Sequence, residues 1–141
     1  MFTLKKSVID IAIVCSDFEK SLQFYRDQIG LEVVLDIEIP DEVAQGAALA
    51  PKGFRHVRLK AGETLIKLME INPAPPKRSF DFQAGVRGLT FIIDDVPGTI
   101  ARMKEKGVEF VGEPVSAPDA KYVACAKGPD GILVELVELF D

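Results

Sequence analysis

Several features that mark special classes of protein are scarce in this sequence. Only two cysteines, Cys15 and Cys125, occur in 141 residues, and the 11 glycines and 9 prolines are scattered. Disulfide scaffolds, fibrous proteins and disordered chains are therefore excluded. We expect both cysteines to be reduced, buried packing residues. The 48% hydrophobic and 28% charged residues are enough for the core of one domain.

Long apolar runs and basic clusters are also missing. No apolar run approaches the ~18 residues that cross a bilayer, and residues 1–6 lack the apolar stretch of a secretory signal. Acidic residues outnumber basic ones by 22 to 17, and no stripe of lysine and arginine is present. The sequence therefore predicts a cytoplasmic protein that binds neither membranes nor nucleic acid.

An internal repeat divides the chain near residue 80. Residues 65–71 read LIKLMEI and residues 133–139 read LVELVEL, so the same alternation of apolar and charged positions occurs twice. This pattern indicates one strand with two distinct faces in each half. Earlier in each half, an apolar strand leads into a helix that ends at a glycine, Gly30 or Gly107.

The repeat predicts two βαβββ modules within a single α+β domain, residues 1–141. Ser16 with Glu19 forms a capping box for the first helix, and Asp95 caps the second. A ferredoxin-like fold fits less well, because it has no use for a tight hairpin at the end of both halves. The expected modules are residues 7–71 and 87–140, joined by a linker over 72–86, with strands at about 9–15, 31–38, 54–60, 64–71, 88–93, 108–113, 121–127 and 132–139.

In their order, these motifs resemble the vicinal oxygen chelate superfamily of glyoxalase I, extradiol dioxygenases, methylmalonyl-CoA epimerase and bleomycin resistance proteins. The resemblance rests on the runs IAIVCSDFEKS (11–21), Phe24-Tyr25, Gly30-Leu31 and Gly128-Pro129-Asp130-Gly131. It implies that the two modules form a curved, cup-like mixed sheet with helices outside. It also implies that the cup holds a small molecule and that the chain forms a homodimer.

The resemblance further assigns four possible metal-ligand positions, at Asp10, Lys67, Gly88 and Glu135. Metal-dependent members usually carry His or Glu there. Only Glu135 is a standard match; Asp10 is a possible oxygen ligand, Gly88 has no side chain, and the Lys67 ammonium would repel a metal ion. We therefore expect no catalytic metal and no other cofactor.

Three charged residues remain at these positions. Asp10 and Lys67 are expected to form a cross-strand pair on neighbouring strands, with Glu135 approaching from the other module or subunit. Two acids and one ammonium in a partly closed cup can form a functional site. The same group of charges is more often a structural ion network.

The first hairpin adds a second group of candidates. A two-residue turn at Ala61-Gly62 would pair His56 with Lys67 and Arg58 with Leu65. The only histidine would then lie beside two cations, a suitable lining for a carboxylate, phosphate or phenolate. Alternatively, Arg58 extends to solvent and His56 is a hydrogen-bonded wall residue. On this register the cup face carries Phe54, His56, Arg58, Lys67 and Met69, while Val57, Leu59, Ile66 and Leu68 face the helices.

The same reasoning places Tyr122, Ala124 and Ala126 on the cup face of the second module, with Val123 and Cys125 in the core. Tyr122 would either contact a bound ring or simply pack against its neighbours. Residues 38–53 are too long for a tight turn and are expected to form a lid, a dimer-crossing loop or a plain connection.

Three functions are compatible with these residues. The first is a metal-independent protein that binds a small anionic or aromatic molecule. The second is a lyase or isomerase in which Lys67 stabilises an enolate or phenolate while Glu135, Asp10 or His56 moves a proton. The third and weakest is a metal-dependent glyoxalase- or dioxygenase-like enzyme that uses Asp10, Glu135 and His56.

Overall fold

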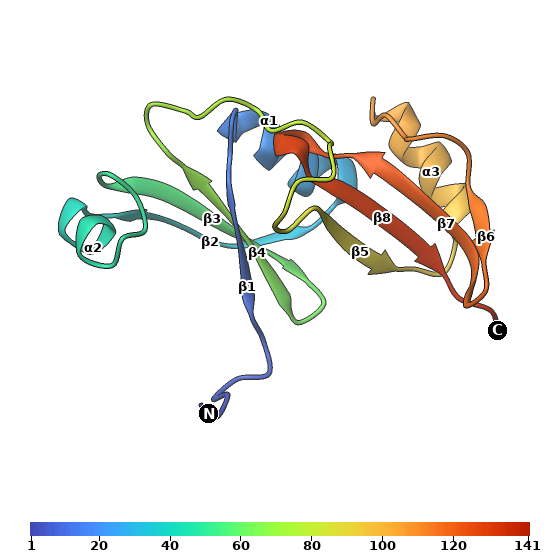
Figure 1. Ribbon diagram of the computed structural model, residues 1–141, viewed down its shortest axis with the longest axis horizontal. Coiled ribbons are helices and arrows are strands. Elements are labelled where there is room, and N and C mark those ends of the chain that lie inside the picture. The colour runs from blue at the N-terminus through green and yellow to red at the C-terminus, as the bar shows by residue number, and fades with distance from the viewer. The chain divides into compact units, whose positions relative to one another are not determined.

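A computed structural model describes residues 1–141, which divide into two compact units, residues 1–77 and 78–141. Each unit contains a strand, a helix and then three further strands (Figure 1). The predicted α+β fold of two βαβββ modules is therefore confirmed. The boundary after Lys77 falls inside the predicted linker, which contains no helix or strand. None of the helices has the length and apolar character needed to cross a membrane.

The first unit contains one four-stranded mixed sheet in the order β1-β4-β3-β2. Strand β1 runs parallel to β4, and the other neighbours are antiparallel. Its elements are β1 (Asp10–Val14), α1 (Phe18–Gln23), a π-helix η1 (Phe24–Ile29), β2 (Glu32–Ile39), α2 (Asp41–Gly46), β3 (Phe54–Ala61) and β4 (Thr64–Glu70).

The first helix begins one residue later than the capping box predicts. The N-cap residue is Asp17, whose side chain accepts a hydrogen bond from the Lys20 amide at 3.2 Å. The residues that follow bury the predicted apolar face, including Phe18 and Leu22. Gly30 ends the π-helical continuation with φ +94°, a left-handed conformation that favours glycine.

Strands β3 and β4 pair in a register two residues away from the predicted one. Arg58 lies opposite Lys67 and His56 opposite Met69, so the predicted pairs His56–Lys67 and Arg58–Leu65 are wrong. The reason is that Gly62 adopts φ +61° and begins the turn, with Ala61 paired to Thr64. Because the shift is even, every side chain keeps its predicted face, and the helix-facing residues are buried: Val57, Leu59, Ile66 and Leu68.

The second unit contains a sheet of the same design, in the order β5-β8-β7-β6. The strand predicted at 108–113 is wrong: Phe110 makes one isolated bridge to Ala126, and Gly112 with φ +73° interrupts the extended chain. The observed elements are β5 (Gly88–Ile92), α3 (Val96–Glu105), β6 (Val115–Ala117), β7 (Ala120–Lys127), a short 3₁₀ turn η2 (Pro129–Gly131) and β8 (Leu133–Glu138).

Helix α3 starts as the sequence predicts, with the Asp95 side chain accepting from the Gly98 amide at 3.0 Å. The helix lies against β7 and β8 (Figure 1). Its first amide, Val96 N–H, donates to the Glu138 carboxylate at 2.9 Å. Only 13% of the Glu138 side chain is exposed, because it satisfies this helix end.

The faces of β7 are the reverse of the prediction. Ala124 and Ala126 are buried on the α3 side, where small side chains allow the helix to approach closely. Tyr122 shares their face and lies opposite Glu138. Cys125 lies opposite Glu135 on the other face and is only half-buried. The predictions that Tyr122, Ala124 and Ala126 face the cup and that Cys125 is in the core are therefore wrong.

Arg55 connects three elements on the helix side of the first sheet. Its guanidinium donates to both carboxylate oxygens of Asp36 on β2, at 3.0 and 2.8 Å, and contacts Glu19 on α1 at 3.3 Å. It also lies 5.0 Å from the centroid of the Phe18 ring. The hydrogen bonds from Arg55 lower the pKa of the Asp36 carboxyl, so the paired form is the charged one.

We predict that Asp36→Asn is less stable than the wild type at pH 7 and loses less stability on acidification. A carboxyl whose folded pKa is lowered contributes stability above its unfolded pKa of ~3.9, and this is lost as pH falls through the folded pKa. Since 47% of the Asp36 side chain is exposed, we expect a difference of about 0.5–1 kcal/mol at pH 7. Urea unfolding at several pH values measures it. Asp119→Asn, at an exposed residue, is the control. The prediction would be contradicted if the free energy of unfolding changed equally with pH in the wild type, Asp36→Asn and Asp119→Asn.

Candidate functional site

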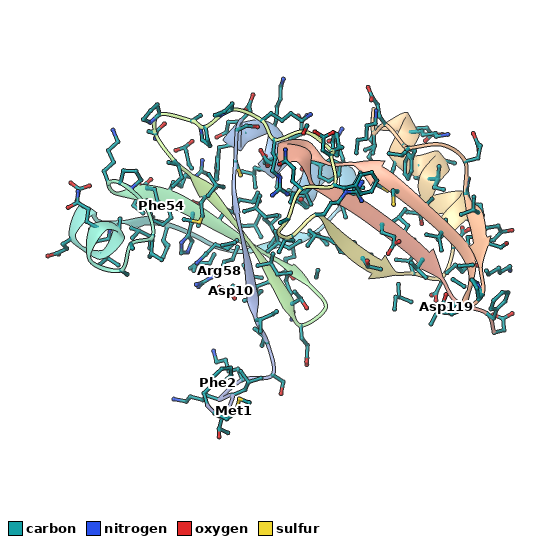
Figure 2. The ribbon with its side chains drawn as sticks, in the orientation of Figure 1. Met1, Phe2, Asp10, Phe54, Arg58 and Asp119 are labelled. Carbon is teal, nitrogen blue, oxygen red and sulfur yellow. The ribbon has the colours of Figure 1, made fainter.

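The candidate site lies on the face of the first sheet opposite the buried helix-facing residues, here called the open face. Alternation along the strands places Asp10 of β1, Lys67 of β4, and His56 and Arg58 of β3 on it. Figure 2 shows Asp10 and Arg58 next to each other, with Phe54 farther along β3 toward α2. Most residues predicted for the site in the first module therefore share one surface.

Asp10 pairs with Arg58 and not with Lys67. The Arg58 Nε lies 2.7 Å from Asp10 Oδ2, as a close ion pair without the geometry of a directed hydrogen bond. The predicted cross-strand pair is wrong, because the parallel register of β1 and β4 sets Ala12 opposite Lys67 and Asp10 opposite Leu65. The strands are neighbours, as predicted, but the longer Arg58 side chain reaches Asp10 from β3.

Lys67 is a cation without a counter-ion. It lies between Ala12 on β1 and Arg58 on β3 and is half-buried, and its side chain makes no ion pair or hydrogen bond. Asp10, the acidic side chain of this group, is already paired with Arg58. The group therefore carries one uncompensated positive charge, in a chain with net charge -5.

His56 is buried with no hydrogen-bond partner at either ring nitrogen. It is only 4% exposed, and the predicted alternative of a hydrogen-bonded wall residue is wrong. Burial, together with the charges of Arg58 and Lys67, lowers the pKa of His56 below its usual value. The imidazole is consequently neutral at pH 7 and presents one N–H donor and one lone-pair acceptor.

Phe54 and Met69 close one end of the open face. Both are buried, and they pack with Ala44 of α2 in a small apolar cluster. The segment expected to be a lid or a long loop thus contains a helix. Asp41 Oδ1 accepts from the Gly53 amide at 2.6 Å, which fixes both ends of this segment together. The Phe54 ring centroid lies 6.2 Å from that of His56, so the apolar end adjoins the polar one.

The remaining predicted residues belong to the second unit. Glu135 accepts a hydrogen bond of 2.7 Å from the Thr90 hydroxyl on β5. Cys125 lies opposite it, and burial followed by the charge of Glu135 raises the pKa of the Cys125 thiol. The thiol therefore stays protonated at neutral pH, as expected of an inert cysteine. Tyr122, on the opposite face, does not join this group.

The residues at the family's metal-ligand positions do not fit a metal ion. Asp10 is engaged by Arg58, Lys67 is cationic, Gly88 has no side chain, and Glu135 is held by Thr90. Within each unit, no three side chains of His, Cys, Asp or Glu gather closely enough to bind an ion. This donor set lacks the ligands that zinc, nickel or iron requires.

Strand β2 contributes residues that the sequence reasoning missed. Leu35 lies opposite Arg58 and Ile37 opposite His56, so both belong to the open face. Ile37 is 38% exposed. The signal was present, since apolar Leu35, Ile37 and Ile39 alternate with charged Asp36 and Glu38.

Comparison with known proteins agrees with this architecture. The profile of the Glyoxalase/Bleomycin resistance protein/Dioxygenase superfamily matches residues 8–136, and the chain belongs to that superfamily. The uncharacterized Bacillus subtilis protein YwkD is 29% identical over 138 residues, which cover 96% of this chain and 98% of YwkD.

Two solved structures show the same fold. A glyoxalase family protein from Bacillus cereus has a TM-score of 0.79 at 20% identity, covering 100% of this chain and 99% of that one. TnmS3, an antibiotic binding protein from Streptomyces, has a TM-score of 0.69 at 24% identity, covering 99% of this chain and 100% of TnmS3. At these identities the likeness concerns the fold alone.

We predict that His56 makes the protein less stable as pH falls from about 7.5 to 5.5. Its folded pKa is lowered, so the unfolded chain, with a His pKa of ~6.5, binds the proton more readily and stability falls with pH. His56→Phe should remove this slope and equal or exceed the wild type at pH 7, because an unpartnered polar group is replaced by an apolar ring. Urea unfolding across this range measures both effects. His56 is the only histidine, so an unchanged slope in the variant would contradict the prediction.

Proposed function

We propose that this protein binds a small organic anion on the open face of its first sheet, without a metal ion. One observation carries the proposal: a buried neutral imidazole with no partner lies beside a lysine with no counter-ion. In this proposal Lys67, Arg58 and His56 contact the anion, Asp10 orients Arg58, and Phe54 and Met69 form the apolar wall.

The energetic argument starts from His56. A buried polar group without a partner costs about 1–3 kcal/mol, and folded proteins carry few of them. A bound oxyanion would accept the imidazole N–H and supply the missing counter-charge for Lys67. Both unfavourable features of the free protein would then become favourable contacts in the complex.

The fold is compatible with such a role. TnmS3, whose architecture is similar, is an antibiotic binding protein. Binding of an antibiotic is therefore a function that this architecture can support. For the present chain the chemistry of the open face favours an anion, and the identity of the molecule has to come from a screen.

A lyase or isomerase is the second candidate, and the neutral state of His56 favours it. An unprotonated imidazole can accept a proton from a bound substrate, while Lys67 stabilises the negative charge of an enolate or phenolate. Glu135, held by Thr90, is an alternative proton acceptor in the second unit.

We predict that Lys67→Ala weakens the binding of carboxylate probes such as benzoate at least about tenfold, because one charge-assisted contact is lost. Isothermal titration or NMR titration gives the affinities. The control is Lys20→Ala, which removes an exposed lysine on α1. Chelator-treated protein should bind as tightly as untreated protein. Equal weakening by the two lysine variants, or loss of binding on chelation, would contradict the proposal.

Turnover distinguishes the two candidates. If the protein only binds, NMR spectra of a bound ligand stay unchanged over days. If it is an enzyme, ligands found in the screen are converted, and His56→Gln or Glu135→Gln slows the conversion while affinity is retained.

We further propose that both modules act together as one domain in a cytoplasmic homodimer. The resemblance to the vicinal oxygen chelate superfamily implies a homodimer, and exposed Val14 of β1 and Ile92 of β5, both strands at sheet edges, provide apolar surface for it. Light scattering should give about twice the chain mass of 15.4 kDa. A monomer mass at micromolar concentration would reject the dimer.

A further inference from the structure

The charges on the open face set the charge of the ligand, provided that the proposed anion binding is correct. Asp10 and Arg58 neutralise each other, His56 is neutral, and Lys67 has no counter-ion. Farther along β3, Lys60 stands opposite Glu32, so their charges are balanced too. Asp36, on the neighbouring strand, faces the helix side and is paired with Arg55. The net charge presented to a ligand is therefore one positive charge.

A single positive charge matches a monoanion. A dianion such as a phosphate monoester would keep one negative charge uncompensated at a half-buried position, which is unfavourable. A carboxylate, in contrast, has two oxygens that can accept from the Lys67 ammonium and the His56 N–H at the same time. The donors of the open face and its single positive charge therefore both match a carboxylate.

An apolar strip borders the charged group on one side. Leu35 and Ile37 lie directly across from Arg58 and His56 on β2, and Ile37 keeps 38% of its surface exposed. Strand β2 is at the edge of its sheet, so this strip has a neighbouring strand on one side only. The distance between neighbouring strands, about 5 Å, is the length of a small ring or a short alkyl chain.

We propose that the open face selects a monoanionic carboxylate with an apolar body, the carboxylate contacting Lys67 and His56 and the body lying on Leu35 and Ile37. Acetate has the charge without the body. Phenylphosphonate has the body with a second charge, and benzyl alcohol has the body without charge. These compounds separate the two parts of the proposal.

The test is NMR titration of the full chain at about pH 8 with benzoate, acetate, phenylphosphonate and benzyl alcohol. Benzoate should bind at least about tenfold more tightly than each of the other three. Ile37→Ser should weaken benzoate several-fold and leave acetate unchanged. Val33→Ser is the matched control, because Val33 is on the same strand with 37% exposure but lies opposite helix-facing Leu59.

The outcomes separate this inference from the function on which it rests. If no anion binds, anion binding and the inference both fail. If phenylphosphonate binds as tightly as benzoate, or acetate does, anion binding stands and the selectivity for an apolar monoanion is overturned. If Ile37→Ser and Val33→Ser have the same effect on benzoate, the apolar body does not lie on β2.

Discussion

The packing of strands β3 and β4 against the helix side determines which of their side chains lie on the open face of the first unit. Val57, Leu59, Ile66 and Leu68 are almost completely buried there. Each contributes about 1.5–3 kcal/mol of hydrophobic stabilisation, so turning either strand over would expose these side chains at great cost. Because side chains alternate along a strand, the residues between them must point the other way. The residues of the open face are therefore fixed by the burial of the alternate residues in the core.

This constraint explains how an acidic chain can carry a local positive site. The net charge of -5 is spread over the molecule, while the candidate site gathers Arg58 and Lys67 with the single acid Asp10. The charge of Asp10 compensates that of Arg58, and no acidic side chain compensates the charge of Lys67. The unpartnered His56 is stable in this position because the buried residues around it are fixed by their own packing. The stability of the rest of the fold offsets the cost of this unpartnered group.

Much of the fold was predictable because it depends on local and repeated signals. The duplication of an alternating strand, the cap at Asp95 and the glycines that end both helices gave the two βαβββ modules. The set of residues on the open face was also predictable, since it requires only the alternation of side chains. The pairing within that set was not. A shift of two residues at the hairpin leaves every face unchanged, so the hydrophobic pattern could not distinguish Gly62-Glu63 from Ala61-Gly62 as the turn.

The sequence by itself determined the family, the modules and which residues of β3 and β4 share the open face of the first unit, because each follows from patterns a few residues long. Tertiary structure decided which of them are partners. Arg58 reaches Asp10 across a strand, α3 selects the alanine face of β7 and turns Cys125 outward, and α2 covers Phe54. Whether a charge is paired or a histidine is buried without a partner depends on contacts between residues distant in the sequence. Only the folded chain brings those residues together.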